Sequence, residues 1–121
     1  MKALAAAAVF LVAALHAGFL ALEMFFWDHP LGRRVFSMTE EQSAQTAILA
    51  ANQGLYNGFI VAGLLWGLIA SKRDVVIFFL LCVIAAGIFG GYTAKPTIYL
   101  TQALPGAAAL LLVLVAGRRG D

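Results

Sequence analysis

The chain has 121 residues, of which 63% are hydrophobic and only 12% are charged. Soluble domains contain about 45–50% apolar residues, and a chain of this length cannot bury so much apolar surface in one water-soluble core. The composition excludes a soluble monomer and predicts a membrane protein. The net charge of +2 is explained by basic residues that flank membrane spans, so we expect no nucleic-acid partner.

The charged residues divide the chain into apolar runs. All of the eight basic and six acidic residues except Glu23 lie at the chain ends or in short gaps between these runs. Each run approaches the roughly 20 residues that a helix needs to cross a bilayer, and the runs are continuously apolar rather than alternating, which disfavours strands. We predict an all-α fold in which residues 1–121 form a single transmembrane domain, an up-down-up-down four-helix bundle. The expected helices span residues 3–27, 40–70, 75–92 and 97–116.

The first run begins with Met1 and Lys2 and is rich in alanine, as in a signal peptide. Its apolar stretch is too long for the hydrophobic region of a signal peptide, and no polar mature domain follows it. We therefore interpret it as a retained first helix.

The gap after the first run predicts one helix end and one helix start. Pro30 lacks a backbone donor and biases the preceding residue away from helix, so the first helix is expected to close there. Thr39 and Gln42 have the spacing of a capping box, so the second helix should start near Glu40. At 1.5 Å per residue, a helix over residues 40–70 is about 46 Å long. Either its first turns stand in the headgroup region or it bends near Gly54.

The distribution of lysine and arginine predicts the orientation of the protein in the membrane. Five basic residues lie on one side of the predicted membrane and three on the other. Because basic residues favour the cytoplasmic side, we expect both termini to be cytoplasmic. The five are Lys2, Lys72, Arg73, Arg118 and Arg119, and the three are Arg33, Arg34 and Lys95.

Small residues recur at a four-residue spacing, as in the pair Gly54 and Gly58 and in two later Gly-x-x-x-Gly pairs that begin at Gly63 and Gly87. Such pairs let two helix backbones approach closely. We expect the contacts mainly within the bundle, and a homo-oligomer through these faces is left open.

Glu23 is the exception among the charges, because it lies inside an apolar run. An ionised carboxylate that faces lipid costs several kcal/mol, so Glu23 is expected to face protein or trapped water. His16 lies seven residues earlier, on the same stripe of the helix within about 20°. The second helix contributes neighbouring amide side chains, and the fourth contributes one. The candidate ligand-binding residues are His16, Glu23, Asn52, Gln53, Asn57 and Gln102.

The predicted depths of these side chains in the membrane place them at two levels. Counted from the outer helix ends, Glu23, Asn52, Gln53 and Gln102 come out about 6–10 Å below the boundary, and His16 and Asn57 about 16 Å. The inner half of each predicted helix is almost wholly apolar. We therefore predict a polar cavity that opens outward above an apolar plug.

One simpler interpretation remains open. The polar side chains could merely bond one another and hold the bundle in register. One histidine and one glutamate two turns apart are too few ligands for a metal, and we predict no metal and no cofactor. The single cysteine, Cys82, is interpreted as an inert core thiol.

Several strings of this sequence resemble a known family. They are Leu15–Phe19 with Leu22–Phe25 and Trp27, then Ala51–Phe59, Phe79–Gly87 and Gln102–Pro105. They are similar to a family of small bacterial four-helix integral membrane proteins that is catalogued as a domain of unknown function. The resemblance implies the four-helix bundle and a bacterial membrane, and it implies no activity. We expect a multi-pass protein of the bacterial inner (cytoplasmic) membrane.

Our leading hypothesis is a binding or transport-type membrane protein of uncharacterised function, with a small polar or amphipathic ligand in the outward-facing cavity. Glu23 would accept charge or a proton, His16 would be its proton partner, and the amides would orient the ligand. Membrane lipid is the other expected partner. The alternatives are a membrane enzyme that uses the Glu23 and His16 pair on a lipophilic substrate, and an accessory subunit that binds a partner helix through its glycine faces.

Overall fold

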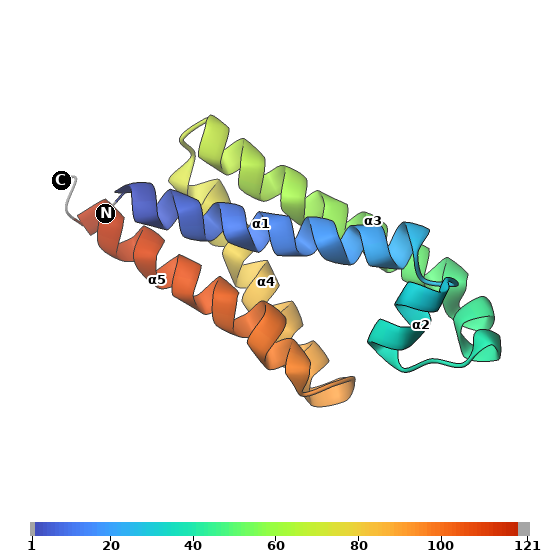
Figure 1. The fold of residues 1–121 in the computed structure, drawn as a ribbon. Helices are drawn as coiled ribbons and strands as arrows, with labels where there is room; N and C mark the ends of the chain where they lie inside the picture. The colour runs from blue at the N-terminus through green and yellow to red at the C-terminus, as the bar shows by residue number, and fades with distance from the viewer. Residues whose placement is uncertain (1, 119–121) are drawn as a thin grey trace. The chain divides into compact units, whose positions relative to one another are not determined.

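The computed structural model describes residues 2–118, so the predicted flanking charges Arg119 and Asp121 lie outside the described residues. Within the described part there is no strand, which confirms the all-α class. The elements are α1 (Lys2–Phe25), α2 (Pro30–Phe36), α3 (Glu40–Ile69), α4 (Arg73–Thr93), the π-helical turn η1 (Tyr99–Ala103) and α5 (Leu104–Arg118), as Figure 1 shows.

Four segments are long and apolar enough to cross a membrane, by length and composition. They are α1, α3, α4 and the continuous segment Tyr99–Gly117, which joins η1 to α5. Their bounds agree with the four predicted helices to within a few residues. The structure thus has the helices of a membrane protein.

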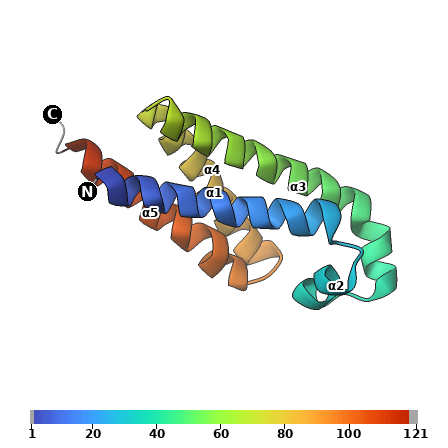
Figure 2. The same cartoon turned by 45° about the horizontal axis from the view of Figure 1, so that its top comes forward.

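The short helix α2 was not predicted. Pro30 was expected only to end the first helix, yet it also occupies the first turn of α2, where its fixed φ and missing N–H are tolerated. His29 caps this turn, because its Nδ1 accepts the backbone N–H of Leu31 at 3.0 Å. Ser37 ends α2 with a left-handed backbone, at φ 54°. Figure 2 shows α2 beside the last turn of α1 and the first turns of α3.

The predicted capping box at the start of α3 is confirmed. The Gln42 backbone N–H donates to Thr39 Oγ1 at 3.1 Å, and the Thr39 N–H donates to Gln42 Oε1 at 2.9 Å. These two bonds satisfy backbone donors that a helix start leaves without partners. Helix α3 therefore begins at Glu40, as expected.

The π-helical turn η1 follows from Pro105. Proline donates no N–H and its ring clashes with the carbonyl four residues earlier, so a regular α-helical turn is disfavoured just before it. The Leu104 N–H instead reaches the carbonyl of Tyr99, five residues back. The Thr101 hydroxyl donates to the Thr97 carbonyl at 3.2 Å.

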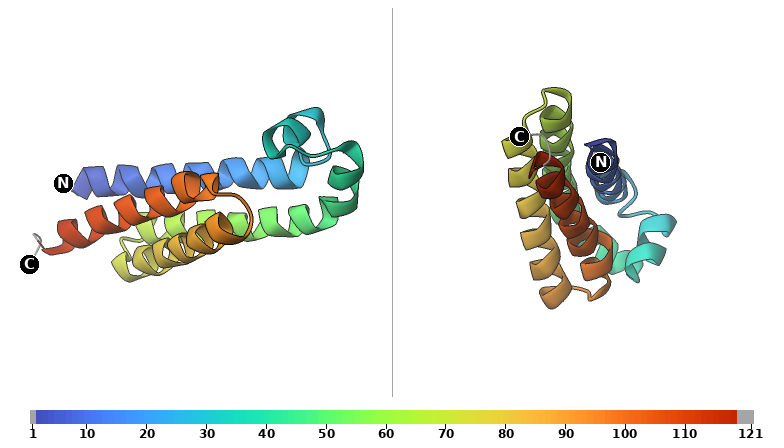
Figure 3. Two further views of the ribbon diagram at one scale, coloured as in Figure 1. Left: turned by 90° about the horizontal axis from the view of Figure 1, so that it is seen from below. Right: turned by 90° about the vertical axis from the view of Figure 1, so that its left-hand side faces the viewer.

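The chain divides into two compact units, which are described separately. Unit 1 comprises Met1–Leu15 and Ala62–Asp121, and unit 2 comprises His16–Val61. In unit 1, α4 and α5 are antiparallel neighbours joined by a short loop (Figure 3). In unit 2, the second part of α1 packs against the first part of α3.

The buried core of unit 1 is apolar. Its members include Val9, Leu64, Leu80, Val83 and Ala109. Glycines bring the helices of this unit together. A side chain at Gly63 would overlap the ring of Phe79, and one at Gly87 would meet the backbone of Ala103.

The Gly-x-x-x-Gly pairs are used inside the units. Gly67 lies against Val76, Gly91 lies against the ring of Tyr99, and the pair in unit 2 lies against α1. These contacts agree with the expectation of internal packing. A homo-oligomer through the same faces stays a prediction.

Gly87→Ala should destabilise the protein. The added Cβ would lie 2.5 Å from the backbone nitrogen of Ala103 and 2.8 Å from its Cα, so α4 and η1 must separate. Overpacking of this kind costs about 1–3 kcal/mol. The measurement is thermal unfolding in detergent micelles, with Gly18→Ala as the control, because nothing lies within 4 Å of a Cβ at residue 18. Equal melting temperatures for the two variants would contradict this packing.

Candidate functional site: a buried carboxylate in unit 2

Buried polar side chains are confined to one unit of the described chain. They are His16, Glu23 and Ser43, with exposed fractions of 1%, 6% and 0%, and all three belong to unit 2. A polar group away from water needs hydrogen bonds, and a charged group needs them most. The partners of these three side chains therefore define the candidate site.

Glu23 is held by two amide side chains of α3. Gln53 Nε2 donates to Glu23 Oε1 at 3.1 Å, and Asn57 Nδ2 donates to Glu23 Oε2 at 3.0 Å. Gln53 and Asn57 are four residues apart, so they project from the same face of α3, one turn apart. The two carboxylate oxygens each receive one N–H, and the carboxylate is fixed in orientation.

Two glycines make this contact feasible. A Cβ at Gly54 would lie 2.6 Å from Met24 Cγ and 3.1 Å from Glu23 Cβ, and a Cβ at Gly58 would lie 3.0 Å from Leu20 Cδ1. The backbone of α3 therefore approaches α1 as closely as glycine allows. At this distance the short amide side chains reach the carboxylate.

The carboxylate has neutral partners. The one ion pair among the described residues joins Arg33 to Asp28 at 2.9 Å. The described residues also contain no group of three or more His, Cys, Asp or Glu side chains that could hold a metal ion. Amide donors orient a carboxylate and stabilise its charge, but they carry no compensating charge.

His16 is fully buried on α1, two turns before Glu23. Its ring packs edge-on against Phe19, with the ring centroids 5.3 Å apart. Seven residues of helix separate the Cα atoms of His16 and Glu23 by about 10 Å along the axis. The burial of His16 agrees with its predicted inward position, and its role as a proton partner stays a prediction.

The other two candidates, Asn52 and Gln102, lie on an exposed helix face and in the other unit respectively. Asn52 lies on the exposed surface of α3, while Gln53 beside it bonds Glu23. Gln102 lies in η1 and belongs to unit 1, where it is half-buried. Unit 2 thus brings together Glu23, Gln53 and Asn57. The outward cavity around all six residues stays a prediction.

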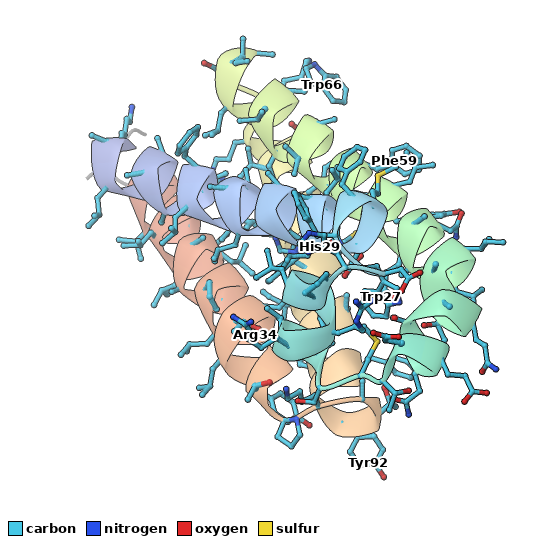
Figure 4. The ribbon with its side chains drawn as sticks, turned by 45° about the vertical axis from the view of Figure 1, so that its right-hand side comes forward. Trp27, His29, Arg34, Phe59, Trp66 and Tyr92 are labelled. Atoms are coloured by element: carbon cyan, nitrogen blue, oxygen red, sulfur yellow. The ribbon has the colours of Figure 1, made fainter. Side chains whose placement is uncertain are left out.

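A second polar cluster in unit 2 was missed. Trp27 Nε1 donates to Thr46 Oγ1 at 2.9 Å, and the ring of Trp27 packs on Phe36 with centroids 4.7 Å apart. Figure 4 shows Trp27 between α2 and the first turns of α3. Its place at the last residue of the first predicted helix is the sequence signal that could have indicated such a contact.

Asp28 reinforces the same contact. The buried hydroxyl of Ser43 donates to Asp28 Oδ1 at 2.7 Å, and Arg33 bonds the same oxygen. Gly32 is buried against the carbonyls of Phe26 and Trp27, so α2 lies tightly on the end of α1. These bonds fasten the segment between α1 and α3 to the first turns of α3.

The two amide bonds do not use all the hydrogen-bond acceptor positions of the Glu23 carboxylate. A carboxylate has about four acceptor positions, and the amides of Gln53 and Asn57 use two of them. The remaining positions can take a proton, a cation or a hydrogen-bond donor of a ligand. The chemistry of these positions is that of an acceptor for a proton, a positive charge or a hydrogen bond.

Comparisons with known proteins identify relatives of this chain. The family described as "Protein of unknown function (DUF1304)" matches residues 10–114, a range that includes all six predicted site residues. The chain is also similar to the "Uncharacterized protein YpaA" of Lactococcus lactis subsp. lactis (strain IL1403). The two are 33% identical over 96 residues, which cover 76% of this chain and 79% of that protein. No solved structure matches the chain.

Asn57→Leu should destabilise the protein by about 1–3 kcal/mol, because it removes a donor from a buried carboxylate. Asn52→Leu is the matched control, since it deletes the same amide from the exposed surface of the same helix. Thermal unfolding of both variants in detergent micelles measures the difference. If Asn52→Leu costs as much as Asn57→Leu, the bond to Glu23 contributes nothing specific.

Proposed function

This chain belongs to the DUF1304 family of proteins of unknown function, and we propose that it binds or moves a small polar or amphipathic ligand at Glu23. The observation that carries the proposal is a buried carboxylate whose described partners are two neutral amides. Glu23 accepts the positive charge or the proton of the ligand. Gln53 and Asn57 hold the carboxylate in place and orient it.

The negative charge of Glu23 limits the class of ligand that we propose for this site. An ionised carboxylate in a membrane span is expensive unless a positive charge compensates it. A ligand with an ammonium group supplies that charge, and its apolar part would contact the neighbouring apolar side chains. Small amphipathic amines fit this requirement better than neutral or anionic amphiphiles.

The membrane placement supports the same proposal. We propose a multi-pass protein of the inner (cytoplasmic) membrane with both termini in the cytoplasm, in an up-down-up-down four-helix bundle. The excess of basic residues at the ends that include Lys2 and Lys72 supports this orientation. Glu23 then lies in the outer half of α1, where a ligand would enter from outside the cell.

Decylamine should stabilise the wild-type protein against thermal unfolding at pH 7, whereas decanol and decanoate, which have the same chain length, should not. Glu23→Gln should abolish the decylamine effect, because the glutamine keeps the size of the side chain and loses its charge. The measurement is the melting temperature in uncharged detergent as a function of decylamine concentration.

Glu41→Gln is the control for this experiment, because Glu41 is an exposed carboxylate at the start of α3. It should retain the full decylamine effect. Equal stabilisation by decanol, or equal loss in Glu41→Gln and Glu23→Gln, would contradict a charge-specific site at Glu23.

The orientation predicts the labelling of single cysteines in intact cells. In a Cys82→Ser background, Arg34→Cys should react with a membrane-impermeant maleimide from outside. Lys72→Cys should react only after the cells are permeabilised. Both positions are exposed: Arg34 lies in the short helix α2, and Lys72 lies between α3 and α4. The opposite labelling pattern would invert the proposed topology.

A further inference from the structure

A pocket of about 490 Å³ lies in unit 1, at the end where α1 begins, α3 ends, α4 begins and α5 ends. None of the six candidate residues of the Glu23 site lines it. Its lining comes from four segments of the chain, all within unit 1. The lining residues are Lys2, Ala5, Ala6, Gly67, Leu68, Ser71, Arg73, Val76, Val113, Ala116 and Gly117.

The charge of this pocket is positive. Lys2 from α1 and Arg73 from α4 line it, and no acidic side chain is among its described lining residues. Ser71 adds a hydroxyl at the turn between α3 and α4, where its backbone is left-handed at φ 54°. Among the described lining residues, two cations and a hydroxyl are donors without a matching anion, which is the composition of an anion site.

Arg73 is fixed in place by α5. Its Nε lies 3.4 Å from the Val113 carbonyl and its Nη2 lies 3.3 Å from the Leu114 carbonyl. A side chain at Gly117 would overlap the guanidinium, so glycine at this position makes room for it. A guanidinium has five N–H donors, and these two carbonyls leave the others for a ligand. Arg73 is therefore a preoriented donor rather than a freely moving surface cation.

The rest of the lining is small or apolar. Alanine and glycine from α1, α3 and α5 keep the pocket open, and Leu68, Val76 and Val113 supply apolar walls. A charged edge beside an apolar wall fits a molecule with an anionic head and an apolar body. A purely aqueous anion would use only the charged edge.

We propose that this pocket binds a phosphate anion, through Lys2, Arg73 and Ser71. The phosphate could belong to a phospholipid headgroup or to a free phosphate ester, because both present the same oxygens. The apolar walls and the position at the ends of four membrane-spanning helices favour the lipid headgroup. Basic pockets between helices on the cytoplasmic side are typical sites for anionic lipids.

Native mass spectrometry of the purified full chain in uncharged detergent tests the proposal. The probes are dihexanoyl phosphatidylglycerol, glycerol 3-phosphate and dihexanoylglycerol, which carry respectively a phosphate with chains, a phosphate alone and chains alone. The phosphatidylglycerol should bind most tightly, and dihexanoylglycerol should not bind. Glycerol 3-phosphate binding as tight as that of the lipid would keep the site and assign it to free phosphate esters.

Lys2→Gln should weaken phosphatidylglycerol binding about fivefold, the change expected for one cation beside an anionic headgroup. Lys72→Gln is the matched control, since Lys72 is exposed next to Arg73 and does not line the pocket. It should change binding less than twofold. Equal weakening in the two variants, or equal binding of dihexanoylglycerol, would overturn the proposal.

Gly117→Ala provides a test that keeps every charge. Its added methyl group displaces the Arg73 guanidinium, so phosphatidylglycerol binding should fall while circular dichroism shows unchanged helicity. Unchanged lipid affinity in Gly117→Ala would mean that the position of Arg73 does not matter, and would also overturn the proposal.

Discussion

The close approach of α1 and α3 in unit 2 is the constraint on which the candidate site depends. A side chain at Gly54 would meet Met24 and Glu23, so the helices would have to separate by roughly the size of a methyl group. The hydrogen bonds that Gln53 and Asn57 donate to Glu23, at 3.1 and 3.0 Å, would then lengthen past hydrogen-bonding distance. The polar site at Glu23 therefore depends on the glycine spacing of α3. The small residues bring the donors to the carboxylate.

The two units solve the packing problem differently. Unit 1 has an apolar core, and lipid offers little hydrophobic drive for helices to associate, so glycine contacts and dispersion must hold it. Unit 2 buries polar groups and holds them with side-chain hydrogen bonds, from Glu23 to the Asp28 and Ser43 pair. Unit 1 therefore relies mainly on close apolar packing, and unit 2 adds side-chain hydrogen bonds between buried polar groups.

The sequence predicted the four long helices because charge is excluded from hydrocarbon, and it predicted the start of α3 because Thr39 and Gln42 form a local motif. It did not predict α2, because Pro30 suits both the end of one helix and the first turn of the next. Nor did the sequence decide whether Asn52 or the pair Gln53 and Asn57 would face Glu23, because that depends on how α3 is rotated about its axis. The glycine stripe carries this information: Asn57 lies about 60° from Gly54 around the helix, and Asn52 about 160°.

The choice of a carboxylate at residue 23 favours the proposed binding role over a purely structural one. Glutamine there could bond Gln53 and Asn57 and hold the helices in register, without the cost of burying a charge. Both described partners of Glu23 are neutral, so the charge gains nothing from them that an amide would lack except stronger hydrogen bonds. Two acceptor positions of the carboxylate remain for another donor. The negative charge therefore supports the proposal that a proton or a cationic group binds to Glu23, while the two amides keep the carboxylate in place.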